Sequence, residues 1–313
     1  MPPALLFPIP PTYPDQVVPF AELVMNGLAG RLWLGQSFAV ESHQMIACLA
    51  GRGIKVPTGL GVTLMPLRHP MEAAAQARSL ALLTGQPVVA GYGAATPELV
   101  ESLRGTPYRK PATAAAGYAQ TVRDMLNGHD RERGGLPKMK HAPVEVGLGV
   151  LRPGMARAAG GVADVAVTWM TPPGYIKDTL IPALAEGAAG RASVPRVATV
   201  VHVALAHPSR DPVKLAHNAA GRHLTAPHYT DMLRRAGVPA DPTDPRSGAK
   251  ALVEAGVYVY GTPEEVVRRL RDYREAGVDE IILNTVGVGL TDGLKAAAAD
   301  AEQILTAMAD ADE

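Results

Sequence analysis

Short apolar runs alternate with longer helix-like segments along most of the chain. Eight runs rich in Val, Ile, Leu and Ala predict strands at 4–9, 32–35, 57–64, 87–93, 144–150, 162–169, 196–205 and 280–287. Most of these runs are continuously apolar, which is typical of parallel strands that are covered on both faces. Helices are predicted at 15–28, 41–51, 70–84, 112–127, 153–160, 175–189, 263–276 and 290–309.

Eight alternating strands and helices predict an α/β fold, a TIM (β/α)8 barrel. A doubly wound sheet is the alternative, but it would use fewer strands and begin with a dinucleotide fingerprint. The glycine clusters "GYG" and "GVGLTDG" do not have that spacing. We therefore expect one barrel domain over residues 1–313.

Residues 207–257 interrupt the alternation with helical pieces and the Pro- and Asp-rich stretch "ADPTDPRSG". This segment is too short to bury a good core by itself. It follows the predicted seventh strand, so we interpret it as a helical insertion at the C-terminal rim of the barrel. Such an insertion lies where it can cover an active site.

Two helix starts are marked by their end residues. Thr262, Pro263 and Glu265 have the pattern of a capping box with proline at the first helical position. Pro70 marks a second start, with His69 as the residue that caps it.

Composition excludes several classes of function. Among 313 residues there are 30 basic and 30 acidic side chains, and aromatic residues make up 4%. Zero net charge gives no electrostatic reason to expect nucleic acid or an anionic membrane as a partner. The single cysteine, Cys48, excludes a disulfide within the chain. The N-terminal residues lack a basic region and are broken by prolines, so we expect no signal peptide and a cytoplasmic enzyme.

The junctions after the predicted strands carry the candidate chemistry. "RLWLGQSFAVESHQMIA" places Gln36 and Ser37 between the second strand and its helix, where the side chains of a barrel active site lie. Ser37 lacks the G-x-S-x-G pattern of a hydrolase nucleophile. Spacings of six and five residues separate His217, His223 and His228, so we predict no metal site there.

Three stretches carry a family resemblance. They are "GLGVTLMPLRHPMEAAAQARSLALLTGQPVVAGYG" at 59–93, "VEVGLGVLRPGMARAAGGVADVAVTW" and "VYGTPEEVVRRLRDYREAGVDEIILN". Together and in this order, they resemble the luciferase-like monooxygenase family. The resemblance implies a TIM barrel that holds FMN or the deazaflavin coenzyme F420 at its C-terminal rim.

The same resemblance implies which residues hold the cofactor. A bulged third strand, with a non-prolyl cis peptide between Gly61 and Val62, would support one face of the ring, together with Leu64. A strand end and helix start would bind the phosphate or ribityl chain, because free backbone N–H groups at a helix N-terminus attract anions. The phosphate-loop residues are Val150, Leu151, Arg152, Pro153 and Gly154, and the loop after strand six adds Trp169, Met170 and Thr171.

Relatives that oxidise alcohols carry Asp-His at the end of strand two and a Glu after strand four. The matching positions here are Gln36, Ser37 and about Thr96. Neither Gln nor Ser is a useful base at neutral pH, which disfavours a base-dependent alcohol dehydrogenase. Gln36 and Ser37 are therefore predicted to orient reactants, with Tyr92 as a catalytic proton donor. Glu41, His43 and Tyr229 are the other candidate donors.

These features predict an oxidoreductase that uses reduced F420 to deliver hydride to an activated C=C or C=N bond of a small molecule or modified peptide. The alternative is a two-component monooxygenase that uses FMN from a separate cofactor reductase. A third possibility is a non-catalytic flavin-binding protein. By analogy with the family, and from the Ala-rich helix at 71–83, we expect a homodimer.

Overall fold

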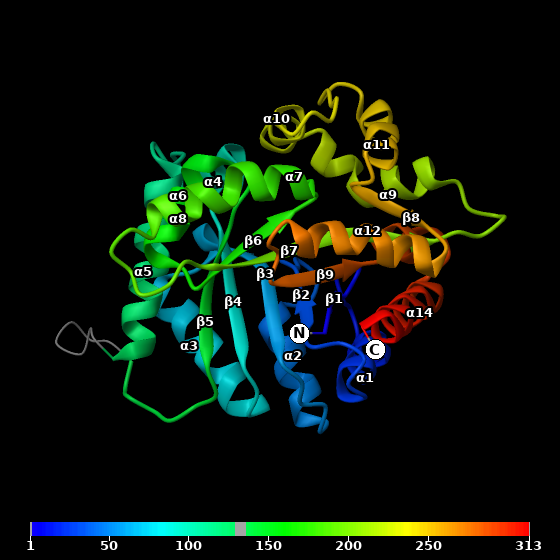
Figure 1. The fold of residues 1–313 in the computed structure, drawn as a ribbon. Helices are drawn as coiled ribbons and strands as arrows, with labels where there is room; N and C mark the ends of the chain where they lie inside the picture. Colours follow the sequence, from blue (N-terminus) through cyan, green and yellow to red (C-terminus); the bar gives the residue numbers. More distant parts are fainter. Residues whose placement is uncertain (1, 129–135, 313) are drawn as a thin grey trace.

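The computed structural model describes residues 2–128 and 136–312, and eight of its strands form a parallel β-barrel (Figure 1). Neighbouring strands pair in the order β6-β5-β4-β3-β2-β1-β9-β7, and pairing of β6 with β7 closes the ring. The predicted TIM barrel is confirmed. The barrel strands are β1 (Ala4–Leu6), β2 (Leu32–Leu34), β3 (Thr58–Leu64), β4 (Val88–Gly93), β5 (Val144–Gly149), β6 (Val165–Trp169), β7 (Arg196–Leu205) and β9 (Glu280–Asn284).

A ninth strand, β8 (Tyr258–Gly261), extends the sheet outside the barrel. It pairs with the last residues of β7, from His202 to Leu205. The sequence pattern did not predict this strand. The predicted eighth strand, 280–287, is also too long, because the chain turns at Thr285 into the helix α13 (Val286–Thr291).

Helices surround the barrel. The helices before β7 are α1 (Pro14–Met25), α2 (Ser42–Gly51), α3 (Pro70–Thr84), α4 (Pro97–Arg104), α5 (Pro111–Asn127), α6 (Pro153–Val162), α7 (Pro173–Tyr175) and α8 (Ile181–Gly187), with a 3₁₀ turn at Met65–Leu67 and a π-turn at Ile176–Leu180. The predicted caps are present: His69 Nδ1 accepts from Met71 N, and Thr262 and Glu265 form a capping box. In the described part of the chain, no helix is long and apolar enough to cross a membrane.

The segment 207–257 contains three helices, α9 (Pro212–Leu224), α10 (Pro227–Arg235) and α11 (Pro245–Glu254). Figure 1 shows them grouped on one side of the molecule, in yellow-green to gold. The chain then continues through β8 to α12 (Pro263–Glu275), and after β9 to α13 and α14 (Leu294–Asp312). The insertion thus leaves the fold at the C-terminal end of β7 and returns at the N-terminal end of β8.

Strand alternation sorts the barrel side chains into an inner and an outer core. The inner core contains Trp33, Val89, Val165, Val167 and Ile282, and Ala198 and Val200 of β7 join it. The Trp33 ring fills the interior so fully that a Cβ on Gly61 would lie 2.9 Å from it. The N-terminal half of the barrel is therefore a packed core, and the C-terminal mouth is the end at which barrels of this kind carry their active sites.

A buried carboxylate closes the N-terminal end of the barrel. Glu280 accepts from Trp33 Nε1 at 2.8 Å and from Arg31 Nε at 3.1 Å. Arg196 Nη1 donates to the other Glu280 oxygen at 2.6 Å, and Arg196 also pairs with Glu145. Burial lowers the pKa of Arg31, while the two carboxylates outweigh burial and raise that of Arg196. These bonds satisfy a charge that would otherwise be costly to bury.

Candidate functional site

The C-terminal mouth of the barrel is lined by glycines on two adjacent strands. On β4 and β5, Gly91, Gly93 and Gly149 face the barrel axis, and we call them the glycine collar. A Cβ on Gly93 would lie 2.7 Å from Val62 Cγ2, and one on Gly149 would lie 3.6 Å from Val62. The collar therefore exists because Val62 leans across β4 and β5.

Val62 takes this position because β3 is bulged. The Gly61–Val62 peptide bond is cis, as the family resemblance implied. The pairing of β3 with β4 shifts between Leu60 and Thr63, so one extra residue of β3 faces β4. After the bulge, Thr63 Oγ1 donates to Gly91 O at 3.2 Å. The bulge places Gly61 and Val62 beside the glycine collar.

Gln36 and Ser37 lie at the end of β2, beside the bulge. Gln36 Oε1 accepts from Leu64 N at 3.1 Å, and Gln36 Nε2 donates to Ser37 O at 2.9 Å. Ser37 is buried, and its Oγ accepts from Ala39 N at 3.1 Å. The structure therefore brings Gln36, Ser37 and Leu64 together. Both polar side chains hold the backbone of the β2 and β3 ends in place.

Tyr92 is not brought to this group. It alternates with the inward-facing Val89 and Gly91 on β4, so its side chain lies in the outer core, where it is fully buried. Its hydroxyl donates to Ala73 O at 3.3 Å, and its ring packs edge-on against Tyr118. Burial raises the pKa of Tyr92 well above its usual range. This placement argues against the predicted catalytic role, because the phenol faces α3 and not the mouth.

A second polar group joins the ends of β2 and β3. Glu41 Oε1 lies 2.7 Å from His43 Nδ1 and 3.4 Å from Arg68 Nη2. Glu41 Oε2 caps α2 by accepting from His43 N and Gln44 N. Burial opposes ionisation of Glu41, but the hydrogen bonds from His43 and Gln44 N and the charges of His43 and Arg68 together outweigh it, and the pKa is lowered. His43 is buried, and its Nε2 has no hydrogen-bond partner among the residues that the structure describes.

The predicted phosphate loop lies at the start of α6. Val150 is buried and donates its N–H to Val167 O at 2.8 Å, Leu151 is half-buried, and Pro153 occupies the first helical position. A Cβ on Gly154 would meet no described atom within 4 Å, so the first turn is open. Arg152 is half-exposed and pairs with Asp231 of α10 at 3.5 Å. That ion pair links the loop to the insertion.

The loop after β6 divides its residues between the two cores. Trp169 faces inward, is half-buried and packs against the inner core. Met170 has φ 51° and is buried in the outer core. Thr171 is buried and its hydroxyl donates to Trp169 O at 3.1 Å. Of these three predicted residues, only Trp169 has a side chain that lines the mouth.

His202 is a mouth residue that sequence reasoning missed. It lies two residues beyond the inward-facing Val200 on β7, opposite Asn284 of β9, and is 1% exposed. Its ring packs edge-on against Trp169, with centroids 5.4 Å apart. Burial lowers its pKa to about 3, so the imidazole is neutral at neutral pH. The signal was available in "RVATVVHVAL", where this histidine shares the parity of Ala198 and Val200.

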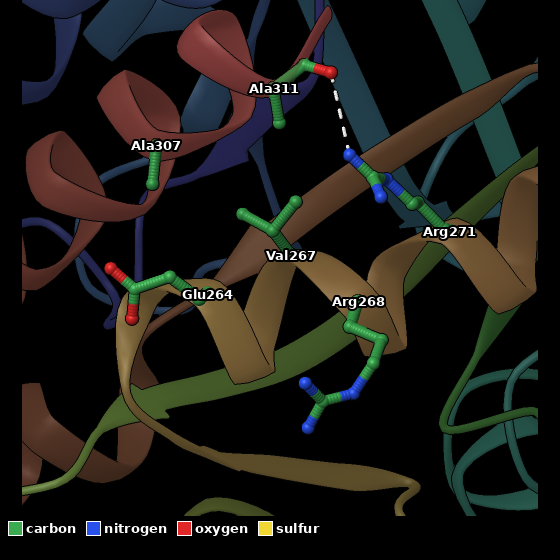
Figure 2. Close-up of a pocket in the computed structure, with 6 residues that line it drawn as sticks. All are labelled: Glu264, Val267, Arg268, Arg271, Ala307 and Ala311. Atoms are coloured by element: carbon green, nitrogen blue, oxygen red, sulfur yellow. Dashed lines mark hydrogen bonds between the residues drawn. The ribbon is translucent and has the colours of Figure 1, made fainter.

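A hollow of about 300 Å³ lies elsewhere, between α12 and α14 (Figure 2). It is lined by Glu264, Val267, Arg268, Arg271, Ala307 and Ala311. Arg271 Nη2 donates to Ala311 O at 3.3 Å across it. This hollow lies on the outside of the helical layer and is not part of the mouth. In the described ranges, no three His, Cys, Asp or Glu side chains are grouped so as to hold a metal ion.

A family model for luciferase-like monooxygenases matches residues 20–280. The chain belongs to this family. The match covers the bulged strand, the phosphate loop and the mouth described above, and it agrees with the resemblance seen in the sequence.

Solved structures of similar fold include proteins of different chemistry. Coenzyme F420-dependent tetrahydromethanopterin reductase from Methanopyrus kandleri is 17% identical, with 98% of this chain and 99% of that chain covered and a TM-score of 0.72. An F420-dependent secondary alcohol dehydrogenase bound to an F420–acetone adduct is 15% identical, with coverages of 98% and 99% and a TM-score of 0.69. The oxygenating constituent of 3,6-diketocamphane monooxygenase from Pseudomonas putida, in complex with FMN, is 16% identical, with coverages of 99% and 98% and a TM-score of 0.66. These likenesses establish the shared barrel.

Proposed function

We infer that this luciferase-like protein is an F420-dependent reductase, which delivers hydride to an activated C=C or C=N bond. The observation that carries the proposal is that the side-chain amide of Gln36 is used in hydrogen bonds to the backbone. Both ends of its amide are engaged with the backbone, at Ser37 O and Leu64 N. Gln36 and Ser37 therefore hold the backbone and offer no base, which suits a reaction in which the cofactor supplies the difficult chemistry.

The mouth has the features that a tricyclic ring needs. Gly61 and Val62 offer a flat support, and a Cβ on Gly35 would meet only Gly61 O, at 3.9 Å, among the described residues. On the far side, the open first turn of α6 would receive a phosphate at Gly154. When bound, reduced F420 supplies the hydride. The protein's residues would hold the ring, exclude water and provide the accompanying proton.

His43 is the group best suited to supply that proton. Its Nδ1 is held by the ionised Glu41, which fixes the ring and leaves Nε2 free to carry a transferable proton. Tyr92 and Tyr229, the other candidates with an acidic hydroxyl, both have a pKa raised by burial. Hydride and proton together saturate the double bond, so the product gains two hydrogens.

The test is a comparison of the two cofactors. Purified protein would be titrated with F420 and with FMN while cofactor fluorescence is followed, and then mixed with reduced F420 and unsaturated acceptors. Tight binding of F420 and acceptor-dependent oxidation of reduced F420 would support the proposal. Binding of FMN, with oxygen consumption in the presence of a flavin reductase, would support the monooxygenase alternative. Binding without turnover would support the non-catalytic role.

Three further predictions remain part of the proposal. The substrate is a small molecule or modified peptide. The protein forms a homodimer through its outer helices. A separate enzyme reduces the cofactor.

A further inference from the structure

Three rings meet at the C-terminal mouth, from three different elements. Trp169 ends β6, His202 lies near the end of β7, and His223 comes from the last turn of the insertion helix α9. The Trp169 ring lies 5.4 Å from His202 and 5.3 Å from His223, between ring centroids. We call these three residues the ring wall. Strand alternation points Trp169 and His202 toward the barrel axis, and the insertion adds His223 beside them.

Each member of the ring wall has a shielded nitrogen without a partner. Trp169 Nε1, His202 Nε2 and His223 Nδ1 make no hydrogen bond within the described part of the chain, although solvent does not reach these atoms. A buried polar atom left without a partner costs about 1–3 kcal/mol. Native structures rarely keep such atoms together unless something satisfies them. Three such atoms on a tryptophan and the two histidines packed against it therefore indicate a group that arrives from outside the protein.

The chemistry of the ring wall is neutral. Burial lowers the pKa of His202 to about 3 and of His223 to about 4, with smaller contributions from His223 to the former and from His228 and Arg222 to the latter. Within the described residues, no ion pair involves any of the three rings, the nearby Arg152 is paired with Asp231, and Arg222 beside His223 is exposed to solvent. A carboxylate or phosphate pressed against these rings would lose its hydration without gaining a counter-charge. An uncharged polar group would gain hydrogen bonds without that cost.

The packing beyond the ring wall fixes its shape. Tyr229 of α10 lies edge-on against His223 at 4.9 Å, and His228 lies 4.6 Å from Tyr229. On the other side, His202 stacks with Tyr258 of β8, at 6.3 Å and 12°. These contacts hold both imidazoles from behind, so their free nitrogens are pre-positioned rather than mobile.

We propose that Trp169, His202 and His223 bind the uncharged, planar, conjugated amide, carbonyl or imine group of the substrate by hydrogen bonds from their ring nitrogens. The proposal rests on the proposed function, because it places the imine C=N bond, or the C=C bond conjugated with the amide or carbonyl, beside the cofactor at the same mouth. It adds a substrate class: neutral and flat, not a carboxylate or phosphate. It also gives the insertion a role, since α9 contributes one of the three rings.

Nicotinamide and nicotinate are a matched pair of probes, because both are flat and conjugated and they differ in charge. Ligand-observed NMR titration would measure the Kd of each probe with the protein alone and with oxidised F420 bound. We expect nicotinamide to bind at least tenfold more tightly than nicotinate. His223→Phe and Trp169→Phe each keep an aromatic ring and remove the ring nitrogens. Each variant should raise the Kd of nicotinamide by about three- to tenfold, the effect of losing one neutral hydrogen bond.

His141→Phe is the control, since this histidine lies before β5 at the opposite end of the barrel. This variant should leave the Kd of nicotinamide and the Kd of nicotinate unchanged. Equal binding of the two probes, or unchanged nicotinamide binding in both folded ring-wall variants, would overturn the proposal. Circular dichroism would establish that each variant is folded. If F420 does not bind but nicotinamide responds to the variants, the proposed function fails and the ring wall stands. If F420 binds and the Kd of nicotinamide is unchanged in the ring-wall variants, the proposed role of the ring wall is wrong and the proposed function is unaffected.

Discussion

The carboxylate of Glu41 holds His43 Nδ1 at 2.7 Å while its other oxygen caps the helix on which His43 lies. One side chain thus fixes both the helix start and the imidazole. Arg68, which follows the bulged strand, reaches the same carboxylate at 3.4 Å. The end of β2 and the end of β3 are therefore joined at the rim where the cofactor is proposed to bind.

Replacing His43 by Asn should remove the proton donor and leave the cofactor site intact. We expect kcat with reduced F420 to fall by about 10²-fold or more, the usual effect of losing a general acid. The Kd for F420 should change by less than about twofold. Stopped-flow oxidation of reduced F420 and fluorescence titration measure the two quantities. A variant that turns over normally would show that the proton comes from elsewhere.

Gly93→Ala should weaken cofactor binding by displacing Val62. The new methyl group would lie 2.7 Å from Val62 Cγ2, so Val62 must move into the space proposed for the ring. We expect the Kd for F420 to rise by at least about tenfold, since overpacking of this kind costs about 1–3 kcal/mol. Gly117→Ala is the matched control for an added methyl, because this exposed position on α5 has open space around it and is not part of the proposed cofactor site. A similar Kd for both variants would argue against a ring beside Val62.

Glu280→Ala should destabilise the barrel strongly. Removal of this carboxylate leaves Arg31 buried with no acid partner among the described residues and takes the acceptor from Trp33 Nε1. Breaking a buried pair in this way costs about 3–5 kcal/mol. Glu254→Ala breaks the exposed pair with Lys250 and should cost less than about 1 kcal/mol. Urea unfolding measures both, and a small effect at Glu280 would contradict the role of the buried network.

His202 should make the fold sensitive to acid. Its pKa is about 3 in the folded protein because burial disfavours the charged ring, with His223 nearby, and is about 6.5 in an unfolded chain. Between these values only the unfolded chain takes up the proton, so stability is complete above pH 6.5 and is lost as the pH falls. The slope is about 1.4 kcal/mol per pH unit for each such proton.

His202→Phe removes this group and should flatten the acid side of the stability curve. Urea midpoints at pH 8 and pH 5 for both proteins separate the effect of packing, seen at pH 8, from the effect of protonation. If the urea midpoint falls equally from pH 8 to pH 5 in the wild-type protein and in the variant, His202 is not kept neutral by the fold.

Much of the barrel follows from the sequence because its strands are buried on both faces and therefore continuously apolar. β8 lies outside the barrel and pairs with β7 alone, so this rule does not apply to it. Residues 285–287 are apolar enough for a strand, yet Asn284 Oδ1 accepts from Val286 N and starts a helix instead. Local hydrogen bonds of this kind are not visible in a hydrophobic pattern.

The site was less predictable than the fold because it depends on which way each strand residue faces. Tyr92 and Gly91 are adjacent in sequence, yet only Gly91 faces the axis. His202 could have been found from its parity with Val200, whereas the contribution of His223 depends on how α9 folds back over β6. Register and long-range packing, which a single sequence does not reveal, decide these cases.

The most direct test of the account is a fluorescence titration of the wild-type protein and the Gly93→Ala variant with F420 and with FMN. The account predicts saturable binding of F420 in preference to FMN, weakened at least tenfold by the added methyl group. Binding of neither cofactor to a folded protein, or F420 binding that is indifferent to the change at Gly93, would contradict it.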